Sequence, residues 1–207
     1  RVDLKICEPL TNGFRFAGSQ RTRYEGLAHQ YRADLDERDR ALALQTSLTF
    51  SWRRDNLQAF GEVMDSRAAR NDAGSYLSTS GVNTLEPVQA YVAWSHGGES
   101  GQTSTLRAGR MTLDVGKRRL VARSRYRNTV DSFSGLDWDW HGARGERARA
   151  FYFRPMNPLP GDDPALLDDE FELDRVMQRN EFFGFYYQPR PFPAGHALEV
   201  YAFEHRL

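Results

Sequence analysis

Eight Lys or Arg residues accompany one acid in the stretch Leu106 to Asn128, LRAGRMTLDVGKRRLVARSRYRN, although the whole chain has 28 basic and 28 acidic residues. Such a run attracts anions, because guanidinium groups pair with carboxylates or phosphates through two parallel hydrogen bonds. The anion is a nucleic acid, a set of carboxylates within the protein, or an acidic solute. The surrounding sequence must supply the elements that hold these side chains.

The first two possibilities can be weighed from composition. A nucleic-acid partner is not expected, because the stretch holds a single aromatic residue, Tyr126, and the chain has no net charge. A solvated loop remains open for residues 117–127, since charge runs often stay in water. The acidic stretch DDPALLDDEFELD, residues 162–174, is either the internal partner of the basic residues or a divalent-ion site, and pairing is the simpler interpretation.

Catalytic patterns are scarce in the sequence. There is no GxSxG motif and no phosphate-binding glycine loop, and the five His residues lack metal-ligand spacing. The single cysteine, Cys7, excludes an internal disulfide and a thiolate metal cluster. We therefore expect no cofactor, no metal and no enzymatic activity. A soluble β-rich polysaccharide-binding protein or lyase, with Tyr, Arg and acidic side chains along a β groove, stays open as the alternative.

Alternation of apolar and polar residues predicts an all-β protein. In SGLDWDWHG, Leu136, Trp138 and Trp140 share one face, and Asp137 and Asp139 share the other. The same rule predicts nine strands, at residues 13–27, 41–53, 57–66, 87–95, 103–113, 132–141, 147–154, 181–188 and 197–204.

The connections between these strands alternate in length. Those at 28–40, 67–86, 114–131 and 155–180 are long, and those at 54–56, 96–102, 142–146 and 189–196 are short. Trp52, Trp94, Trp140 and Tyr187 stand beside the short connections, as in the aromatic girdle of an outer-membrane barrel. The pattern favours an antiparallel up-and-down transmembrane β-barrel over a β-sandwich. The short connections are then periplasmic and the long ones face outside.

In such a barrel the polar face lines a wet lumen, where charged side chains are tolerated. The charged residues predicted to face it are Arg15, Arg21, Arg23, Glu25, Glu62, Arg107, Asp137, Asp139 and Glu199. Strict alternation turns Arg110 toward lipid, so we expect a β-bulge in the 103–113 strand. Arg107 and Arg110, with Arg21 and Arg23, would then form a positive constriction, with some of the basic residues at 117–127 at its mouth.

Five segments resemble the alginate-export family of outer-membrane β-barrels. They are RTRYEGL (21–27), FGEVMDSR (60–67), EPVQAYVAW (86–94), LRAGRMTLDVGKRRLVARSRYRNTVDSFSGLDW (106–138) and RARAFYFRP (147–155). The fourth is the most specific, and the resemblance covers residues 14–155 well. By motif position Arg21, Arg23 and Glu25 match the family's charged first strand, Glu62 its third strand, and Arg107 and Arg110 its Gly-Arg strand.

The resemblance implies a monomeric barrel of eighteen strands in the bacterial outer membrane, which selects an acidic polysaccharide through an arginine-rich constriction. Residues 1–207 then form a single β-barrel domain that is an N-terminal fragment, about half of a longer barrel. The expected partners are an anionic polysaccharide or another small anion, outer-membrane lipid, and periplasmic export components.

Overall fold

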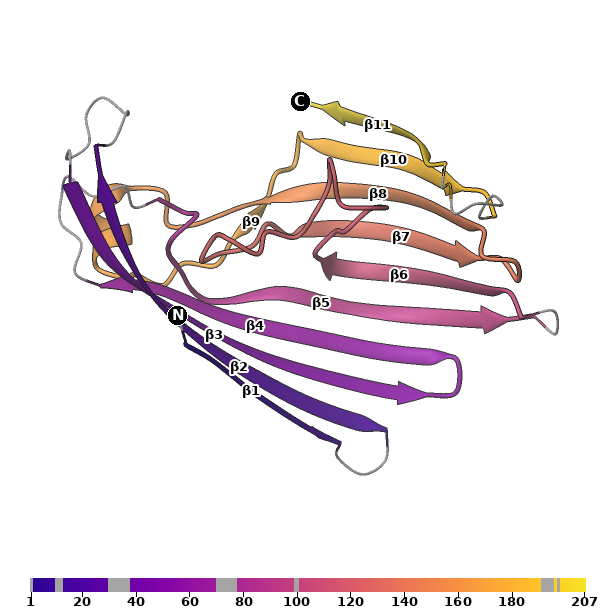
Figure 1. Ribbon diagram of the computed structural model, residues 1–207, viewed down its shortest axis with the longest axis horizontal. Helices are drawn as coiled ribbons and strands as arrows, with labels where there is room; N and C mark the ends of the chain where they lie inside the picture. The colour runs from indigo at the N-terminus through magenta and orange to yellow at the C-terminus, as the bar shows by residue number, and fades with distance from the viewer. Residues whose placement is uncertain are drawn as a thin grey trace.

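The computed structural model describes residues 2–9, 13–29, 38–69, 78–98, 101–190, 196 and 198–207. Within these ranges ten antiparallel strands follow one another in chain order in one sheet (Figure 1). They are β1 (Val2–Pro9), β2 (Phe14–Ala28), β3 (Arg38–Arg54), β4 (Leu57–Ala69), β5 (Asn83–Gly97), β6 (Thr103–Met111), β7 (Phe133–His141), β8 (Arg147–Asn157), β10 (Glu181–Gln188) and β11 (Val200–Arg206).

Two small elements lie between β8 and β10. The helix α1 (Asp163–Leu167) begins after Asp162, whose side chain accepts a hydrogen bond from the backbone N–H of Ala165. The two-residue strand β9 (Arg175–Val176) pairs with the end of β8. None of the helices in the described ranges has the length and apolar character needed to cross a membrane.

The predicted all-β, up-and-down architecture is confirmed. Each long strand pairs with its neighbour in sequence, and the sheet is not closed, since β1 and β11 are each paired on one side. A sandwich would bury the apolar face between two sheets, but Leu136 is 51% exposed and Trp138 is 36% exposed. The apolar face is therefore the outside of the sheet.

We call the face that carries Leu136 and Trp138 the outer face, and the face that carries Asp137 and Asp139 the inner face. Register places Phe14 beside Trp52 and Trp94 beside Leu57 on the outer face, at the short-turn end. The exposed apolar side chains of the strands include Phe14, Leu48, Phe50, Leu57, Val63, Val92, Trp94, Leu106, Leu136, Trp138, Phe185 and Tyr187. This apolar band suits contact with lipid.

The band ends before the strands do. On the outer face of β4, Val63 is followed by Asp65 and Arg67, which form an ion pair of 2.9 Å. Strands β3, β4 and β5 continue past this level, so they exceed the predicted ranges 41–53, 57–66 and 87–95. Alternation in hydrophobicity detects the apolar band, whereas backbone pairing continues beyond it.

Other boundaries differ from the prediction as well. Strand β1 was missed, although Val2, Leu4 and Ile6 alternate with polar residues and the strand pairs with β2 along its length. Strand β6 ends at Met111 rather than 113, and β11 spans 200–206 rather than 197–204. The expected connections at 28–40 and 189–196 lie largely outside the described residues, and the one at 67–86 lies outside them at 70–77.

The bulge expected in the 103–113 strand is not in β6. The pairing of β6 with β5 and β7 runs without a shift from Thr103 to Arg110. The shifts occur instead between β4 and β5, beyond Glu62. In β6 itself the irregular residue is Gly109, with φ of 131°, where a side chain would collide with the backbone of β5.

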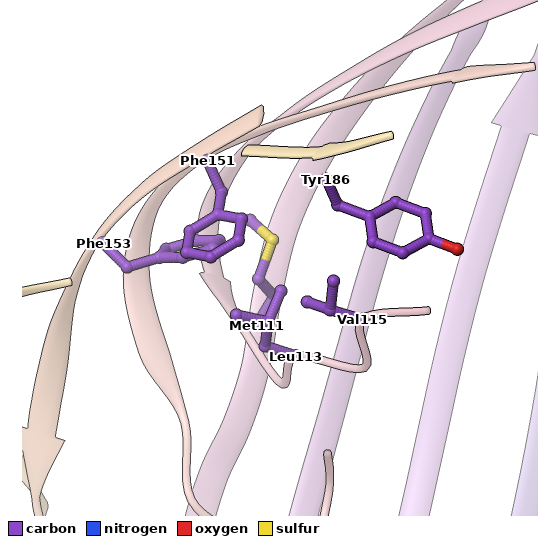
Figure 2. Close-up of a cluster of buried hydrophobic side chains, with 6 residues drawn as sticks. All are labelled: Met111, Leu113, Val115, Phe151, Phe153 and Tyr186. Atoms are coloured by element: carbon purple, nitrogen blue, oxygen red, sulfur yellow. The ribbon is translucent and has the colours of Figure 1, made fainter. Parts of the chain in front are cut away.

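The β6–β7 loop, residues 112–132, lies against the inner face. Leu113 and Val115 of the loop, with Met111, form a buried cluster with Phe151, Phe153 and Tyr186 of the sheet. Figure 2 shows the three aromatic side chains directed from the sheet toward the loop. Burial of these apolar side chains, at about 25 cal/mol per Å², offsets part of the cost of ordering the loop. The basic residues of the loop are thereby carried onto the inner face.

Candidate functional site

An ion pair fastens the middle of the β6–β7 loop to strand β4. The two terminal nitrogens of Arg123 donate to the two carboxylate oxygens of Glu62, at 2.7 and 2.6 Å. Ser47 and Gln89, from the strands on either side of β4, also donate to Glu62, at 2.8 and 2.6 Å. Glu62 is buried, so its charge is satisfied by four hydrogen bonds rather than by water.

Asn128 anchors the end of the loop. Its side-chain nitrogen lies within hydrogen-bond distance of the carbonyl oxygens of Leu44, Arg67 and Gly81, at 2.9, 3.1 and 2.9 Å. Its own carbonyl oxygen accepts from Gln45 and from Ser66, at 2.5 and 2.6 Å. One buried residue therefore connects β3, β4 and the β4–β5 connection to the loop.

Arg21 and Arg23 of β2 bind the backbone of the same loop. Arg21 donates to the carbonyl oxygens of residues 125 and 127, at 3.1 and 2.7 Å. Arg23 donates to the carbonyl oxygen of Tyr126 and is ion-paired with Glu25. These arginines were predicted to face the lumen, and they lie on the inner face. There they hold main-chain oxygens of the loop.

A ladder of ion pairs covers the inner face of β6, β7 and β8. Arg107 lies 2.5 Å from one carboxylate oxygen of Asp137, and Arg149 lies 2.6 Å from the other. Asp139 pairs with Arg147 at 2.9 Å. The side chain of Asp137 is fully buried, so two guanidinium groups replace its hydration.

Arg110 belongs to a separate cluster. It pairs with Glu86 of β5 and with Asp174, at 2.9 Å from the latter, and donates to the hydroxyl oxygen of Ser132. Asp174 ends the acidic stretch that was expected to pair with the basic loop. That interpretation holds for Arg110 but is wrong for the basic residues of the loop, whose ion pairs are Arg118 with Asp114, Arg123 with Glu62, and Arg127 with Asp131.

The acidic stretch instead fastens the β8–β10 connection to the sheet. Asp169 accepts from the backbone N–H of Ala68 and its carbonyl oxygen accepts from Thr84, at 3.2 and 3.1 Å. Burial raises the pKa of the Asp169 carboxyl, and the N–H of Ala68 opposes this shift. The alternative of a divalent-ion site gains no support, since the described residues contain no group of three or more His, Cys, Asp or Glu side chains with that geometry.

Three basic residues of the loop differ from those already described. Lys117, Arg119 and Arg125 are exposed. They make no ion pair with a carboxylate in the part of the chain that the structure describes. Arg15, near the short-turn end of β2, is likewise exposed and without such a pair among the described residues. The charge of these cations remains available to a solute.

The predicted set therefore falls into separate groups. Arg107, Asp137 and Asp139 form one cluster and Arg21, Arg23 and Glu25 another, while Glu62 meets Arg123 and Arg110 meets Glu86. Participants that sequence reasoning missed include Glu86, Asn128, Arg147 and Arg149. Arg149 could have been predicted, because in RARAFYF it alternates with Ala148 and Ala150 and shares the polar side of a predicted strand with Arg147. No pattern in the sequence marks Asn128.

A family model described as alginate export matches residues 14–206, nearly the whole chain. No curated protein and no solved structure matches the chain.

Proposed function

Because this chain belongs to the alginate export family, a family of outer-membrane β-barrel transport proteins, we propose that it lines an anion-selective channel for an acidic polysaccharide such as alginate. The outer face meets outer-membrane lipid and the inner face lines the aqueous path. The protein works as a monomer and carries the polymer without chemical change. Periplasmic export components would deliver the polymer to the short-turn end.

One observation carries this proposal: the β6–β7 loop places exposed, uncompensated cations over the inner face. Lys117, Arg119 and Arg125 supply positive charge where a polyanion would pass. Fixed positive charges beside a narrow aqueous path lower the barrier for anion entry. Each guanidinium pairs reversibly with a carboxylate when water is present, so a polyuronate can move from one to the next.

Nine of the residues predicted to face the lumen or to form the constriction take different roles in this proposal. Arg15 is a direct contact for the polymer. Arg21, Arg23 and Glu25 hold the loop, and Glu62 does so through Arg123. Arg107 and Arg110, with Asp137 and Asp139, shape the wall and contribute less net field, because their charges are paired. The constriction is thus assembled from the loop and the wall together.

Closure of the sheet is a further part of the proposal. Lipid cannot satisfy the free backbone groups of β1 and β11, so further strands must pair with both edges. We propose that residues 1–207 form an N-terminal half of a single eighteen-stranded barrel domain, as the family resemblance implies.

The test is ion selectivity of the complete protein in planar lipid bilayers. Replacing Lys117, Arg119 and Arg125 together by Ser should reduce the anion-to-cation permeability ratio several-fold, because the uncompensated charge is removed. Arg107→Ser is the matched variant for a paired arginine and should change the ratio less. An unchanged ratio in the triple variant would remove the loop cations from the proposal.

The lyase alternative has a separate test. A lyase would release unsaturated uronates that absorb in the ultraviolet, and the absorbance would be lost on replacing Tyr24 or Tyr91. Tyr24 is exposed at 56% on the outer face, opposite Glu25 in the alternation of β2. We expect no such product from purified protein and alginate, since the proposed role is passage of an intact polymer.

A further inference from the structure

A cavity of about 250 Å³ lies on the inner face at the end of the strands where the long connections begin. Its lining comes from four parts of the chain: strand β2, strands β3 and β4, the β4–β5 connection, and the β6–β7 loop. The volume corresponds to about eight water molecules at ~30 Å³ each. It is larger than one ion needs and slightly smaller than a pocket for a drug-sized ligand.

Strand register explains the floor of this cavity. Ala43 stands between Arg23 of β2 and Ala68 of β4, and Ala41 stands opposite Glu25. The three alanines are almost fully buried, and their methyl groups occupy the inner face where neighbouring strands carry large side chains. The result is a small apolar floor with the Arg23–Glu25 ion pair along one edge.

Polar groups surround this floor. The hydroxyl groups of Ser78 and Ser80 are 2.7 Å apart and line the cavity from the β4–β5 connection. Arg127 lines it from the β6–β7 loop, and its contact with Asp131 is a long one of 3.4 Å between two largely exposed side chains. The neighbouring Tyr126 is 88% exposed, so its ring is available at the opening. Exposed ion pairs of this kind are weak, so Arg127 can exchange Asp131 for another carboxylate.

The buried side of the cavity is lined by Asn128. The side-chain oxygen of Asn128, a residue that lines the cavity and is 2% exposed, has no hydrogen-bond partner among the described residues. An apolar floor, hydroxyl and carboxylate groups at the edges and one available guanidinium match the surface of a pyranuronate.

We propose that this cavity is a binding subsite for one uronate residue of the transported polymer. The sugar ring lies on Ala41, Ala43 and Ala68, its carboxylate pairs with Arg127, and its hydroxyl groups bond Ser78, Ser80 and Glu25. Tyr126 covers one ring face, as aromatic side chains do in many sugar sites. The inference rests on the proposed function, but it needs shape as well as charge, so the two can fail separately.

The experiment measures block of single-channel current by an alginate trisaccharide in the complete protein. Ala43→Leu fills the floor and should weaken the block tenfold or more, with the anion-to-cation permeability ratio unchanged. Ala17→Leu, on the inner face of β2 and outside the cavity lining, is the matched control and should leave the block unchanged. Heat-modifiable migration in gels verifies that each variant folds.

A second variant and a neutral sugar complete the experiment. Tyr126→Ser alters an exposed side chain, so it should fold normally and weaken the block several-fold. Maltotriose, a neutral trisaccharide, should block at least tenfold more weakly than the uronate. If Ala43→Leu and Tyr126→Ser both leave the block unchanged, there is no subsite here, whatever the selectivity. Equal block by maltotriose would overturn the assignment to a uronate.

Discussion

The arginines of the sheet and the basic residues of the β6–β7 loop have the same chemistry and different surroundings. Arg107 and Arg149 each bond the buried carboxylate of Asp137, whereas Lys117 and Arg119 are exposed and have no carboxylate partner in the described ranges. Charge in the sheet therefore builds the structure, and charge in the loop remains available to a solute. The comparison teaches that the number of arginines facing a lumen does not measure its electric field.

The strongest way to break this comparison is to remove Asp137. Asp137→Ala removes the buried carboxylate that Arg107 and Arg149 share, and breaking a buried pair in this way costs about 3–5 kcal/mol. We expect the free energy of unfolding, measured with urea in lipid vesicles, to fall by that order.

Asp131→Asn serves as the exposed control, since its pair with Arg127 lies at 3.4 Å with both side chains more than half exposed. Its effect should stay below about 1 kcal/mol. Similar losses of stability in the two variants would show that burial does not separate the sheet from the loop.

An intermediate effect, on opening of the β6–β7 loop, is expected at the ion pair that joins the loop to the sheet. Glu62→Gln removes the charge that Arg123 binds, and a hydrogen bond to a charged group contributes about 1.5–3 kcal/mol. The population in which the loop leaves the inner face should rise roughly 10- to 100-fold. Trypsin cleavage after the basic residues of the loop measures it, because a docked loop is cut only when it opens.

Ser47→Ala is the control for that variant, because it removes a neutral donor to Glu62 and leaves the ion pair with Arg123 in place. It should accelerate cleavage much less. If Glu62→Gln is cut no faster than the unmodified protein, the apolar cluster around Leu113 holds the loop without help from the ion pair.

The smallest expected effect is on the pH dependence of the free energy of unfolding. It concerns a third region, the β8–β10 connection, where a partly buried carboxyl group has no ion pair like those of Asp137 among the described residues. Burial raises the pKa of Asp169, so the folded protein holds this proton more tightly than the unfolded chain does. Its contribution to the free energy of unfolding should therefore decrease as pH rises through the range just above the ordinary Asp pKa of about 3.9. Asp169→Asn removes this contribution, so the free energy of unfolding of the variant should rise more, or fall less, with pH in this range than that of the unmodified protein. A smaller rise or a larger fall in the variant would contradict the sign.

Alternation was sufficient to predict much of the fold. The period of two in SGLDWDWHG separates Trp138 from Asp137, and the structure exposes the first and buries the second. Strand ends were less predictable, because pairing of β3 with β4 continues past the apolar band. Arg21 and Arg23 were expected to bind the solute, but they bind the loop instead. The sequence could not predict this, because their acceptors are backbone carbonyls about a hundred residues away. Any residue type carries such a carbonyl, so no side-chain pattern marks it.

The C-terminal end of the β6–β7 loop is attached to the sheet largely through main-chain atoms. Arg21 and Arg23 hold the main chain at positions 125–127, and Asn128 also bonds mostly to main-chain carbonyls. The attachment is therefore largely indifferent to which side chains the neighbouring positions display. Lys117, Arg119 and Arg125 can therefore be replaced together without changing the contacts that hold the loop. Acidic residues at these positions, for example, would admit a polycation.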